Sequence, residues 1–404
     1  MKHDVERCLK CKKARCQIGC PIHTPIPEVI TLYLNNEFEQ AGALLFYNNP
    51  LSLVCSFVCD HQKQCYGNCI LNMKKQPIPF YKLEQDLSRR YLDTLQLQIA
   101  LKKESIAIIG AGPAGIVSAL LLALEGYRVT LFEKMSKIGG MVQYGIPNFR
   151  FDKSILMNYQ KLLTQLHVDI KLNTEVLHLN ELKDNYSAII LSNGLSNSKR
   201  LGIKGEHQHH VISAIDYLKD PKRYPMKHKK VIVIGAGNVA MDAARTAKFY
   251  GGESYIYYRK TFDEMPASKL EIQEAIHEGV QFELLKAPIE ILESSIVFAN
   301  CMNVKDELGS IKTEIIPHET ETVAVDYIIY AISQTLDQNF IDLNSLVINK
   351  HILGVDETMM TSIDGIFACG DIITGPKTVV DASNTAKEVV NHVKEYLDKK
   401  RKFT

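Results

Sequence analysis

Eight of the ten cysteines in this chain lie before residue 70, in two closely spaced groups. The first group has the spacing C-x2-C-x4-C-x3-C, ends directly before a proline, and consists of Cys8, Cys11, Cys16 and Cys20. The second group has the spacing C-x3-C-x5-C-x3-C and consists of Cys55, Cys59, Cys65 and Cys69. Thiols gathered in this way form disulfides, bind structural zinc or hold iron–sulfur clusters.

The three kinds of thiol chemistry differ in the sequence context that they need. The N-terminal sixteen residues, MKHDVERCLKCKKARC, lack the apolar core of a signal peptide, so we expect reduced thiols rather than disulfides. Zinc sites often use C-x2-C pairs, of which Cys8–Cys11 is one. Cys20-Pro21 matches the C-P ending of bacterial ferredoxin runs, although the preceding gaps differ from theirs. Spacing alone therefore favours iron–sulfur clusters only slightly and leaves zinc open.

Two glycine-rich loops have the context of dinucleotide-binding sites. The apolar strand Ser105–Ile109 leads into GAGPAG, a helix over Ile116–Glu125 and a strand over Arg128–Glu133. The strand Val231–Ile234 leads in the same way into GAGNVA, a helix to Tyr250 and a strand Ser254–Tyr258. In such units the pyrophosphate lies on the N–H groups at the start of the helix. The candidate contacts are Gly110, Gly112, Pro113, Ala114 and Gly115 in the first loop and Gly235, Gly237, Asn238 and Val239 in the second.

The residues after the second strand of each unit indicate two different ligands. Glu133 can accept hydrogen bonds from both hydroxyls of an adenosine ribose. The matching position of the other unit is Tyr258, followed by Arg259 and Lys260, which suit a 2′-phosphate or form a solvated strand end. We therefore expect FAD in the first unit and NADPH in the second, with NADH possible.

A late strand and helix add further candidates for contact with the flavin. Gly370-Asp371 follows the strand Gly365–Ala368, where it can reach the ribityl chain, and a closing helix runs over Val379–Leu397. The positive end of that helix can point at the flavin ring, which adds Thr378 and Val379 to the candidate contacts.

These motifs predict an α/β chain with three regions. Residues 1–102 are expected to form an all-α domain with helices over Ile26–Tyr47 and Leu83–Leu101. Residues 103–225 and 326–404 are expected to form the FAD domain, into which the NADPH domain, 226–325, is inserted. Both nucleotide domains would have parallel, Rossmann-like sheets.

The overall charge and hydropathy give no support for a nucleic-acid or membrane partner. Lys and Arg number 47 against 46 Asp and Glu, so there is no global argument for binding nucleic acid or anionic membranes. The longest apolar stretch, Ile116–Leu124, is too short to span a bilayer. We expect a cytoplasmic protein without a membrane partner.

Three sequence stretches resemble one family of flavoproteins. Glu133-KMSKI-Gly139-Gly140 is similar to the E-x5-GG stretch of glutathione-reductase-like proteins. MVQYGIPNFR, ending at Arg150, and YRKTFDEMPA, starting at Tyr258, resemble signatures of the glutamate synthase small subunit and the N-terminal half of dihydropyrimidine dehydrogenase. The resemblance implies a glutathione-reductase-type fold and puts Lys134, Gly140 and Arg150 among the FAD contacts. One departure is Ser192-Asn193-Gly194, where these proteins usually have A-T-G.

The same resemblance implies how the thiols are shared between two 4Fe–4S clusters. One cluster would be held by Cys8, Cys11, Cys16 and Cys69. The other would be held by Cys20, Cys59, Cys65 and the side chain of Glu84, with Gln85 as the alternative fourth ligand. Cys55 would then be a cysteine that does not bind iron.

Three functions are compatible with these features. The first is an electron-input subunit that passes electrons from NADPH through FAD and the clusters to a larger catalytic subunit, in a hetero-oligomer. The second is a free-standing NAD(P)H:ferredoxin or acceptor reductase that serves a small electron carrier. The third is a regulatory or assembly scaffold, which the intact glycines, Glu133 and Asp371 argue against. Hydride transfer to a flavin needs no side-chain acid or base, so no catalytic residue is expected.

Overall fold

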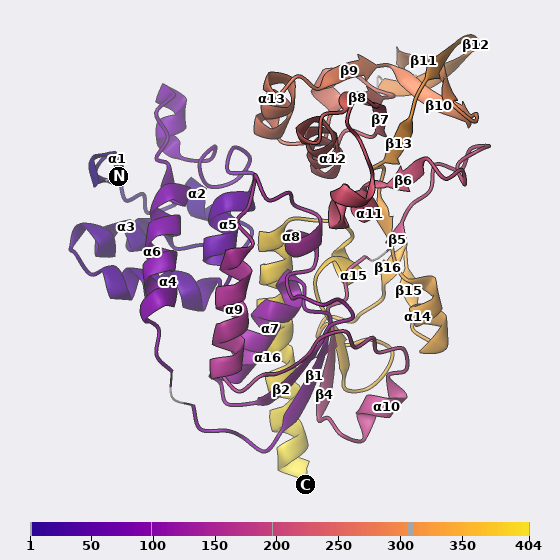
Figure 1. The fold of residues 1–404 in the computed structure, drawn as a ribbon. Helices are drawn as coiled ribbons and strands as arrows, with labels where there is room; N and C mark the ends of the chain where they lie inside the picture. The colour runs from indigo at the N-terminus through magenta and orange to yellow at the C-terminus, as the bar shows by residue number, and fades with distance from the viewer. Residues whose placement is uncertain (1, 98, 196, 306–310, 404) are drawn as a thin grey trace. The chain divides into compact units, whose positions relative to one another are not determined.

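The computed structural model describes residues 2–97, 99–195, 197–305 and 311–403 (Figure 1). The chain forms two compact units. Unit 1 comprises Met1–Gln143, Asn148–Ser196 and Thr335–Thr404, and unit 2 comprises Tyr144–Pro147 and Asn197–Gln334. The second unit is thus inserted in the sequence of the first.

The N-terminal part of unit 1 is helical, as predicted. Its elements are α1 (Lys2–Glu6), α2 (Arg15–Ile18), α3 (Ile26–Leu34), α4 (Phe38–Asn48), α5 (Ser52–Val58), the 3-10 helix η1 (Ile70–Lys74) and α6 (Phe80–Thr94). The predicted helix over 26–47 is two helices, because Asn36 takes a left-handed conformation between them, with a φ of 63°. The predicted helix over 83–101 is α6, which begins after Pro79 and ends where the Thr94 hydroxyl bonds back to the Arg90 carbonyl.

These short helices share one apolar core. Val29, Ile30, Leu45 and Leu83 are buried to within 1% of complete coverage. Cys16 on α2 and Cys8, Cys65 and Cys69 in the connecting segments also contact this core. No single helix of the described chain is long and apolar enough to cross a membrane, and the bent pair α4–α5 qualifies by length and composition alone.

A parallel sheet forms the centre of unit 1, with the strand order β17-β4-β1-β2-β3. Its strands are β1 (Ser105–Ile109), β2 (Arg128–Phe132), β3 (Asp169–Lys171), β4 (Ala188–Leu191) and β17 (Ile366–Ala368). The strands β1, β4 and β17 are apolar runs that are buried almost throughout, as expected for strands covered on both faces. Strands β2 and β3, toward one edge, are partly exposed.

Helices and short elements complete unit 1. The longer helices are α7 (Pro113–Leu124), α9 (Ser154–Gln165) and α16 (Val379–Phe403). The shorter elements are α8 (Met141–Tyr144), α10 (Asn180–Lys183), α14 (Gln338–Leu343), α15 (Asp371–Thr374), and the hairpin β15 (Ile348–Asn349) and β16 (Ile352–Leu353). Helix α16 lies along α7 (Figure 1) and also contacts α5, so the closing helix touches both the sheet layer and the helical head.

Unit 2 repeats the parallel arrangement with the strand order β6-β13-β7-β8-β9. Its strands are β6 (Val211–Ser213), β7 (Lys230–Ile234), β8 (Glu253–Tyr258), β9 (Gln281–Leu284) and β13 (Tyr327–Tyr330). Its helices are α11 (Ala214–Lys219), η2 (Pro221–Arg223), α12 (Asn238–Phe249), η3 (Phe262–Glu264) and α13 (Lys269–His277). A small antiparallel sheet of β10 (Lys286–Ile291), β11 (Ser295–Lys305) and β12 (Ile311–Ala324) is attached to it.

Unit 2 is larger than the predicted range 226–325. Strand β6 pairs with β13, and β13 pairs with β7, so segments before residue 226 and after residue 325 are hydrogen-bonded into one sheet. The short strands β5 (Asn197–Ser198) and β14 (Gln334–Thr335) lie where the chain passes between the units. The glycine motif marks the centre of such a sheet, whereas its outer strands carry no motif of their own.

Candidate functional site

The first glycine loop joins β1 to α7, and a glycine is favoured at each of its three glycine positions for a different steric reason. Gly110 has a φ of 99° and faces the backbone of Ser192 and Asn193. A Cβ on Gly115 would lie 1.9 Å from the Gly110 carbonyl oxygen, so only glycine lets the helix start this close to the strand. A Cβ on Gly112 would meet no atom nearer than 3.9 Å. The open space at Gly112, the N-cap of α7, fits the approach of a pyrophosphate.

A cavity of about 70 Å³ lies beside this loop and contains the predicted ribose residue. It is lined by residues that include Gly110, Glu133, Lys134, Thr174 and Asn193. The Glu133 carboxylate already accepts hydrogen bonds from the N–H groups of Ala111 and Met135, both at 2.8 Å. These two bonds hold the carboxylate in position. Each of its oxygens has a further lone pair, so the carboxylate can still accept hydrogen bonds from the hydroxyls of a ribose.

The late Gly370-Asp371 pair, a predicted FAD contact, lies against the first loop. A Cβ on Gly370 would lie 2.9 Å from the Cβ of Ala114, and Gly370 has a φ of 76°. Burial raises the pKa of the Asp371 carboxyl to about 6. Helix α16 begins at Val379, and Thr378 bonds to the Asp381 carboxylate at its start.

The remaining FAD candidates differ in how tightly their positions are constrained. Gly140 approaches the loop, since its Cβ would lie 2.8 Å from the Gly112 Cα. Lys134 is half-exposed and pairs with Glu175 at 3.6 Å. Arg150 lies just before the buried Phe151, outside the residues that line the cavity beside Gly110.

Sequence reasoning missed the part that Ser192 has in this site. Its hydroxyl donates toward the carbonyl oxygens of Ile109 at 3.0 Å and Gly110 at 2.8 Å, and the residue is buried. The serine therefore stabilises the turn from β1 into the loop. Its signal in the sequence is the departure from A-T-G at this position.

The second glycine loop in unit 2 has the same geometry. Gly235 has a φ of 134° and approaches the Ala331 carbonyl, whereas the nearest atom to a Cβ on Gly237 is 4.0 Å away. Gly237 is the N-cap of α12, and Asn238 and Val239 form its first turn. The Asn238 amide oxygen accepts a hydrogen bond from Ser268 N–H, which ties the loop to the start of α13.

The two basic residues after β8 differ in their surroundings. Lys260 forms an ion pair with Glu264 at 3.2 Å. Arg259 is exposed, and its guanidinium has no carboxylate partner within the described ranges. Arg259 is therefore the freer of the two cations toward a phosphate.

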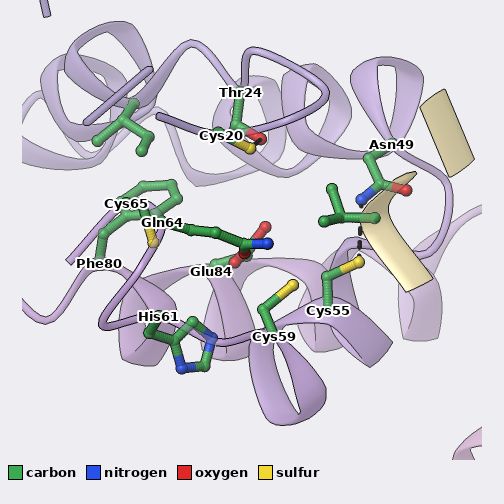
Figure 2. Close-up of a pocket in the computed structure, with 12 residues that line it drawn as sticks. Cys20, Thr24, Asn49, Cys55, Cys59, His61, Gln64, Cys65, Phe80 and Glu84 are labelled. Carbon is green, nitrogen blue, oxygen red and sulfur yellow. Dashed lines mark hydrogen bonds between the residues drawn. The ribbon is translucent and has the colours of Figure 1, made fainter. Parts of the chain in front are cut away.

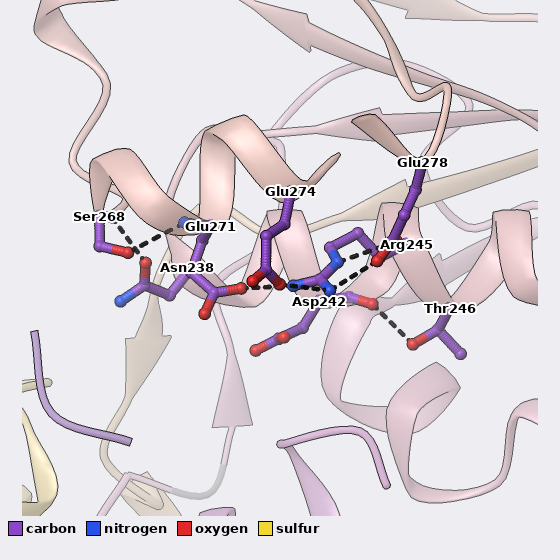
Figure 3. A network of polar contacts seen from close by, with 8 residues as sticks. All are labelled: Asn238, Asp242, Arg245, Thr246, Ser268, Glu271, Glu274 and Glu278. Carbon is purple, nitrogen blue, oxygen red and sulfur yellow. Dashed lines mark hydrogen bonds and ion pairs between the residues drawn. The ribbon is translucent and has the colours of Figure 1, made fainter. Parts of the chain in front are cut away.

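A charge network centred on the buried Arg245 holds α12 against α13, and sequence reasoning missed it (Figure 3). The Arg245 guanidinium contacts the carboxylates of Glu271 and Glu274 at 2.7 Å and that of Glu278 at 2.6 Å. Glu271 and Glu274 lie on α13 and Glu278 is its C-cap, and this spacing puts the three glutamates on one face of the helix. The network fixes the helix that starts at the second glycine loop.

Segments distant in sequence bring the predicted ligands of the second cluster to one cavity (Figure 2). Its lining includes three cysteines and the acid that the resemblance grouped together, namely Cys20, Cys59, Cys65 and Glu84. It also includes Cys55, which sequence reasoning had set aside, and His61. Gln85, the alternative fourth ligand, is not among the residues that line it. We refer to this space as the thiol cavity.

Glu84 is the most informative residue of the thiol cavity. Only 6% of it is exposed, and its carboxylate has no hydrogen bond or ion pair in the part of the chain that is described. Burial, with the nearby Cys55, raises its pKa well above the ordinary value. A buried acid without a partner is costly, so this position points to a ligand that takes a negative donor. Three thiols and a carboxylate fit one 4Fe–4S cluster.

The predicted ligands of the other cluster, Cys8, Cys11, Cys16 and Cys69, also lie near one another. The thiol of Cys8 interacts electrostatically with those of Cys11 and Cys69, and the thiol of Cys16 with those of Cys8 and Cys69. Burial raises the pKa of Cys16 to about 11. Thiols must lose their protons to bind metal, so iron binding would offset this burial cost.

The thiol cavity touches the start of helix α16. Val380 is 2% exposed and packs in one apolar cluster with Cys20, Ile22 and Cys55, against which Cys59 and Val379 also lie. Lys387, further along α16, donates to the side chain of Asn48 at 3.0 Å. The helix whose first residue is a candidate flavin contact is therefore also part of the wall of the thiol cavity.

Two parallel sheets with glycine loops and a thiol-rich helical head define an oxidoreductase that uses two dinucleotides. The chain belongs to the pyridine nucleotide-disulphide oxidoreductases, whose family model matches residues 93–386, within the group that includes the glutamate synthase small chain and the dihydropyrimidine dehydrogenase subunit PreT. The model of dihydropyrimidine dehydrogenase domain II, with its 4Fe–4S cluster, matches residues 1–94. The protein is an FAD- and NAD(P)H-dependent oxidoreductase with an iron–sulfur domain, which decides between the iron–sulfur and zinc alternatives.

Relatives with known roles are similar over nearly the whole chain. The glutamate synthase [NADPH] small chain of Escherichia coli is 28% identical over 98% of this chain and 91% of its own length. The NAD-dependent dihydropyrimidine dehydrogenase subunit PreT homolog of Salmonella typhi is 31% identical over 98% and 94%. The NADP(+)-dependent formate dehydrogenase subunit beta of Moorella thermoacetica is 31% identical over 95% of this chain, which spans only 60% of that subunit.

Solved structures with low sequence identity share the fold. Mycobacterium tuberculosis FprA in complex with NADPH superposes with a TM-score of 0.65 at 18% identity, covering 74% of this chain and 86% of that one. Thioredoxin reductase of T. acidophilum gives a TM-score of 0.57 at 18% identity, covering 74% and 99%. These likenesses establish the two parallel sheets of the fold.

Proposed function

We propose that this protein is an electron-input subunit. It takes a hydride from NADPH on unit 2, and electrons leave through FAD on unit 1 and two 4Fe–4S clusters to a partner subunit of glutamate synthase or dihydropyrimidine dehydrogenase type. When bound, NADPH and FAD supply hydride transfer and the clusters supply one-electron transfer. The roles of this chain are to bind, to orient and to exclude water.

One observation carries the proposal: Val380 on α16 packs against Cys20 and Cys55 of the thiol cavity. Thr378 and Val379, directly before it, are candidate contacts of the flavin ring, and Gly370 lies against the first glycine loop. The flavin site and the second cluster would thus share the start of α16 as a common wall. A short separation of this kind is what electron transfer between them needs.

The residues of this chain have separate tasks in the proposed function. Gly112 and Gly237 leave the start of their helices open for a pyrophosphate, and Glu133 orients an adenosine ribose. Arg259 supports the choice of NADPH, because an exposed guanidinium can bind a 2′-phosphate with two hydrogen bonds. In the head, one cluster would use Cys8, Cys11, Cys16 and Cys69, and the other would use Cys20, Cys59, Cys65 and Glu84.

Anaerobic reduction of the purified protein tests the proposal. Addition of NADPH should bleach the oxidised-flavin absorbance, and paramagnetic signals of reduced clusters should follow in the same sample. Bleaching of the flavin without any cluster signal, in protein that contains about eight iron atoms, would contradict an electron-input role. A protein that lacks flavin after reconstitution would favour the scaffold function.

The partner is tested by purification from the native cell under anaerobic conditions. A stable complex with a larger oxidoreductase chain supports the subunit role. Recovery of the free chain, with rapid reduction of ferredoxin and no larger partner, would support the free-standing reductase instead.

A further inference from the structure

The thiol cavity contains one donor more than a four-iron cluster needs. A 4Fe–4S cluster takes four protein ligands, and Cys20, Cys59, Cys65 and Glu84 supply four in the proposed function. The thiol of Cys55 lines the same cavity and is 3% exposed (Figure 2). Thiolates are the preferred protein ligands of iron–sulfur clusters, so this extra thiol competes chemically with the carboxylate of Glu84.

Helix α5 directs Cys55 toward the predicted cluster ligands. Cys55 and Cys59 are four residues apart, which puts both on one face of the helix. Both side chains line the thiol cavity (Figure 2). The side-chain amide of Asn49 donates to the Cys55 sulfur at 3.3 Å and holds that side chain in one orientation.

A buried hydrogen bond joins α5 to α6, the helices that carry Cys55 and Glu84. The hydroxyls of Ser52 on α5 and Ser88 on α6 lie 2.8 Å apart, and both residues are buried. Ser52 is one turn before Cys55, and Ser88 is one turn after Glu84. The two donors therefore approach the same cavity from two helices that are held together beside them.

We propose that Cys55 is a second ligand for the iron that Glu84 binds, so that this cluster has a carboxylate form and an all-thiolate form. The proposal rests on the second cluster of the proposed function. In the exchange the Fe–O bond to Glu84 breaks, an Fe–S bond to Cys55 forms, and the thiol proton passes to the released carboxylate. No electron is transferred and no co-reactant is needed. The cavity thus permits a choice between two ligands at one iron.

Three variants of the full-length protein test this proposal under anaerobic conditions: Glu84→Ala, Cys55→Ser and the double variant. Iron content and the electron paramagnetic resonance spectrum of the reduced protein are measured for each. Glu84→Ala should keep about eight iron atoms and show a changed spectrum, because Cys55 replaces the carboxylate. Cys55→Ser should keep the wild-type iron content and show the spectrum of the carboxylate form alone. The double variant should lose the second cluster and keep about four iron atoms, which also shows that the head still folds.

Two results would overturn the proposal. The first is an equal loss of iron in Glu84→Ala and in the double variant, because Cys55 would then give no support to the cluster. The second is loss of the cluster in Cys55→Ser alone, because Cys55 would then be the primary ligand. Cys369→Ser, a buried thiol outside the cavity, is the matched control and should change neither measurement. About four iron atoms in the wild type would instead contradict the second cluster itself.

Discussion

The guanidinium of Arg245 donates to the Glu271 carboxylate at 2.7 Å, and the two side chains are only 4% and 9% exposed. Arg245 lies on α12, whose first turn is the second glycine loop, and Glu271 lies on α13. The Ser268 hydroxyl also caps α13 by accepting from Glu271 N–H. The ion pair and the cap together fix the helix pair that positions the nucleotide loop of unit 2.

We therefore expect Arg245→Ala to destabilise the protein by about 3–5 kcal/mol, because it leaves the Glu271 carboxylate buried and unpaired. Urea-induced unfolding of unit 2, followed by tyrosine fluorescence, measures the loss. Lys219→Ala removes an exposed pair with Asp216 and should cost less than about 1 kcal/mol. A similar small cost for Arg245→Ala would show that the buried pair is not needed.

Two glycines of the first loop should separate cofactor binding from folding. Gly112 has an extended backbone that any residue adopts, and its Cβ would meet open space, so Gly112→Ala should change the stability of the apo-protein by no more than about 0.5 kcal/mol. Its methyl group would occupy the path of the pyrophosphate and should weaken FAD binding at least about tenfold, or ~1.4 kcal/mol. Flavin fluorescence measures the affinity.

Gly115→Ala is the contrasting variant. Its Cβ would overlap the Gly110 carbonyl, so this variant should lose about 1–3 kcal/mol of stability without any cofactor present. Thermal unfolding of the two apo-variants makes the comparison. Equal stability of both apo-variants would contradict the different steric roles of these glycines.

FAD binding should weaken as the pH falls below about 6. The carboxyl of Asp371 has its pKa raised to about 6 by burial, and its ionised form is the better acceptor for a ribityl hydroxyl. The affinity should be constant between about pH 7 and 8 and fall by up to about tenfold per pH unit below 6. Asp371→Asn should remove this slope, and flavin fluorescence titrations from pH 5 to 8 measure it.

The stability of the apo-protein should change in the opposite direction with pH. The folded pKa of Asp371 lies above the ordinary value of 3.8, so the folded state binds the proton more tightly. This carboxyl therefore stabilises the apo-protein most below pH 3.8, and that stability is lost as the pH rises to about 6. The denaturation midpoint of the apo-protein is measured against pH for the wild type and for Asp371→Asn. An identical pH dependence in the two proteins would contradict the raised pKa of Asp371.

Arg259→Ala should weaken the binding of NADPH and leave that of NADH unchanged. Loss of a charge-assisted hydrogen bond to the 2′-phosphate costs about 1.5–3 kcal/mol, or roughly 10- to 150-fold in affinity. Lys260→Ala should have a smaller effect, because Glu264 already pairs with Lys260 at 3.2 Å. Flavin bleaching at varied nucleotide concentration measures both. Equal losses for NADPH and NADH would show that Arg259 does not bind the 2′-phosphate.

Local spacing was sufficient to predict the elements that carry the glycine loops. The strand Ser105–Ile109 was predicted with its observed bounds, and the helices and strands around both loops agree within a few residues. Such motifs can be predicted from sequence because the strand, the turn and the helix follow one another in the chain. Each of them also favours particular residue types, such as glycine in the turn. The boundary of unit 2 was not readable, because β6 and β13 are joined only by lateral hydrogen bonds.

The sequence by itself determined the chemistry: reduced thiols in two groups, two dinucleotide loops, and the family resemblance that grouped Cys20, Cys59 and Cys65 with Glu84. Only the tertiary structure decided that Cys55 shares their cavity, that Val380 forms part of its wall, and that three glutamates surround Arg245. The physical reason is that the kind of ligand atom a residue offers depends on its own side chain alone. Burial and the approach of donors are properties of helices packed together from distant parts of the chain.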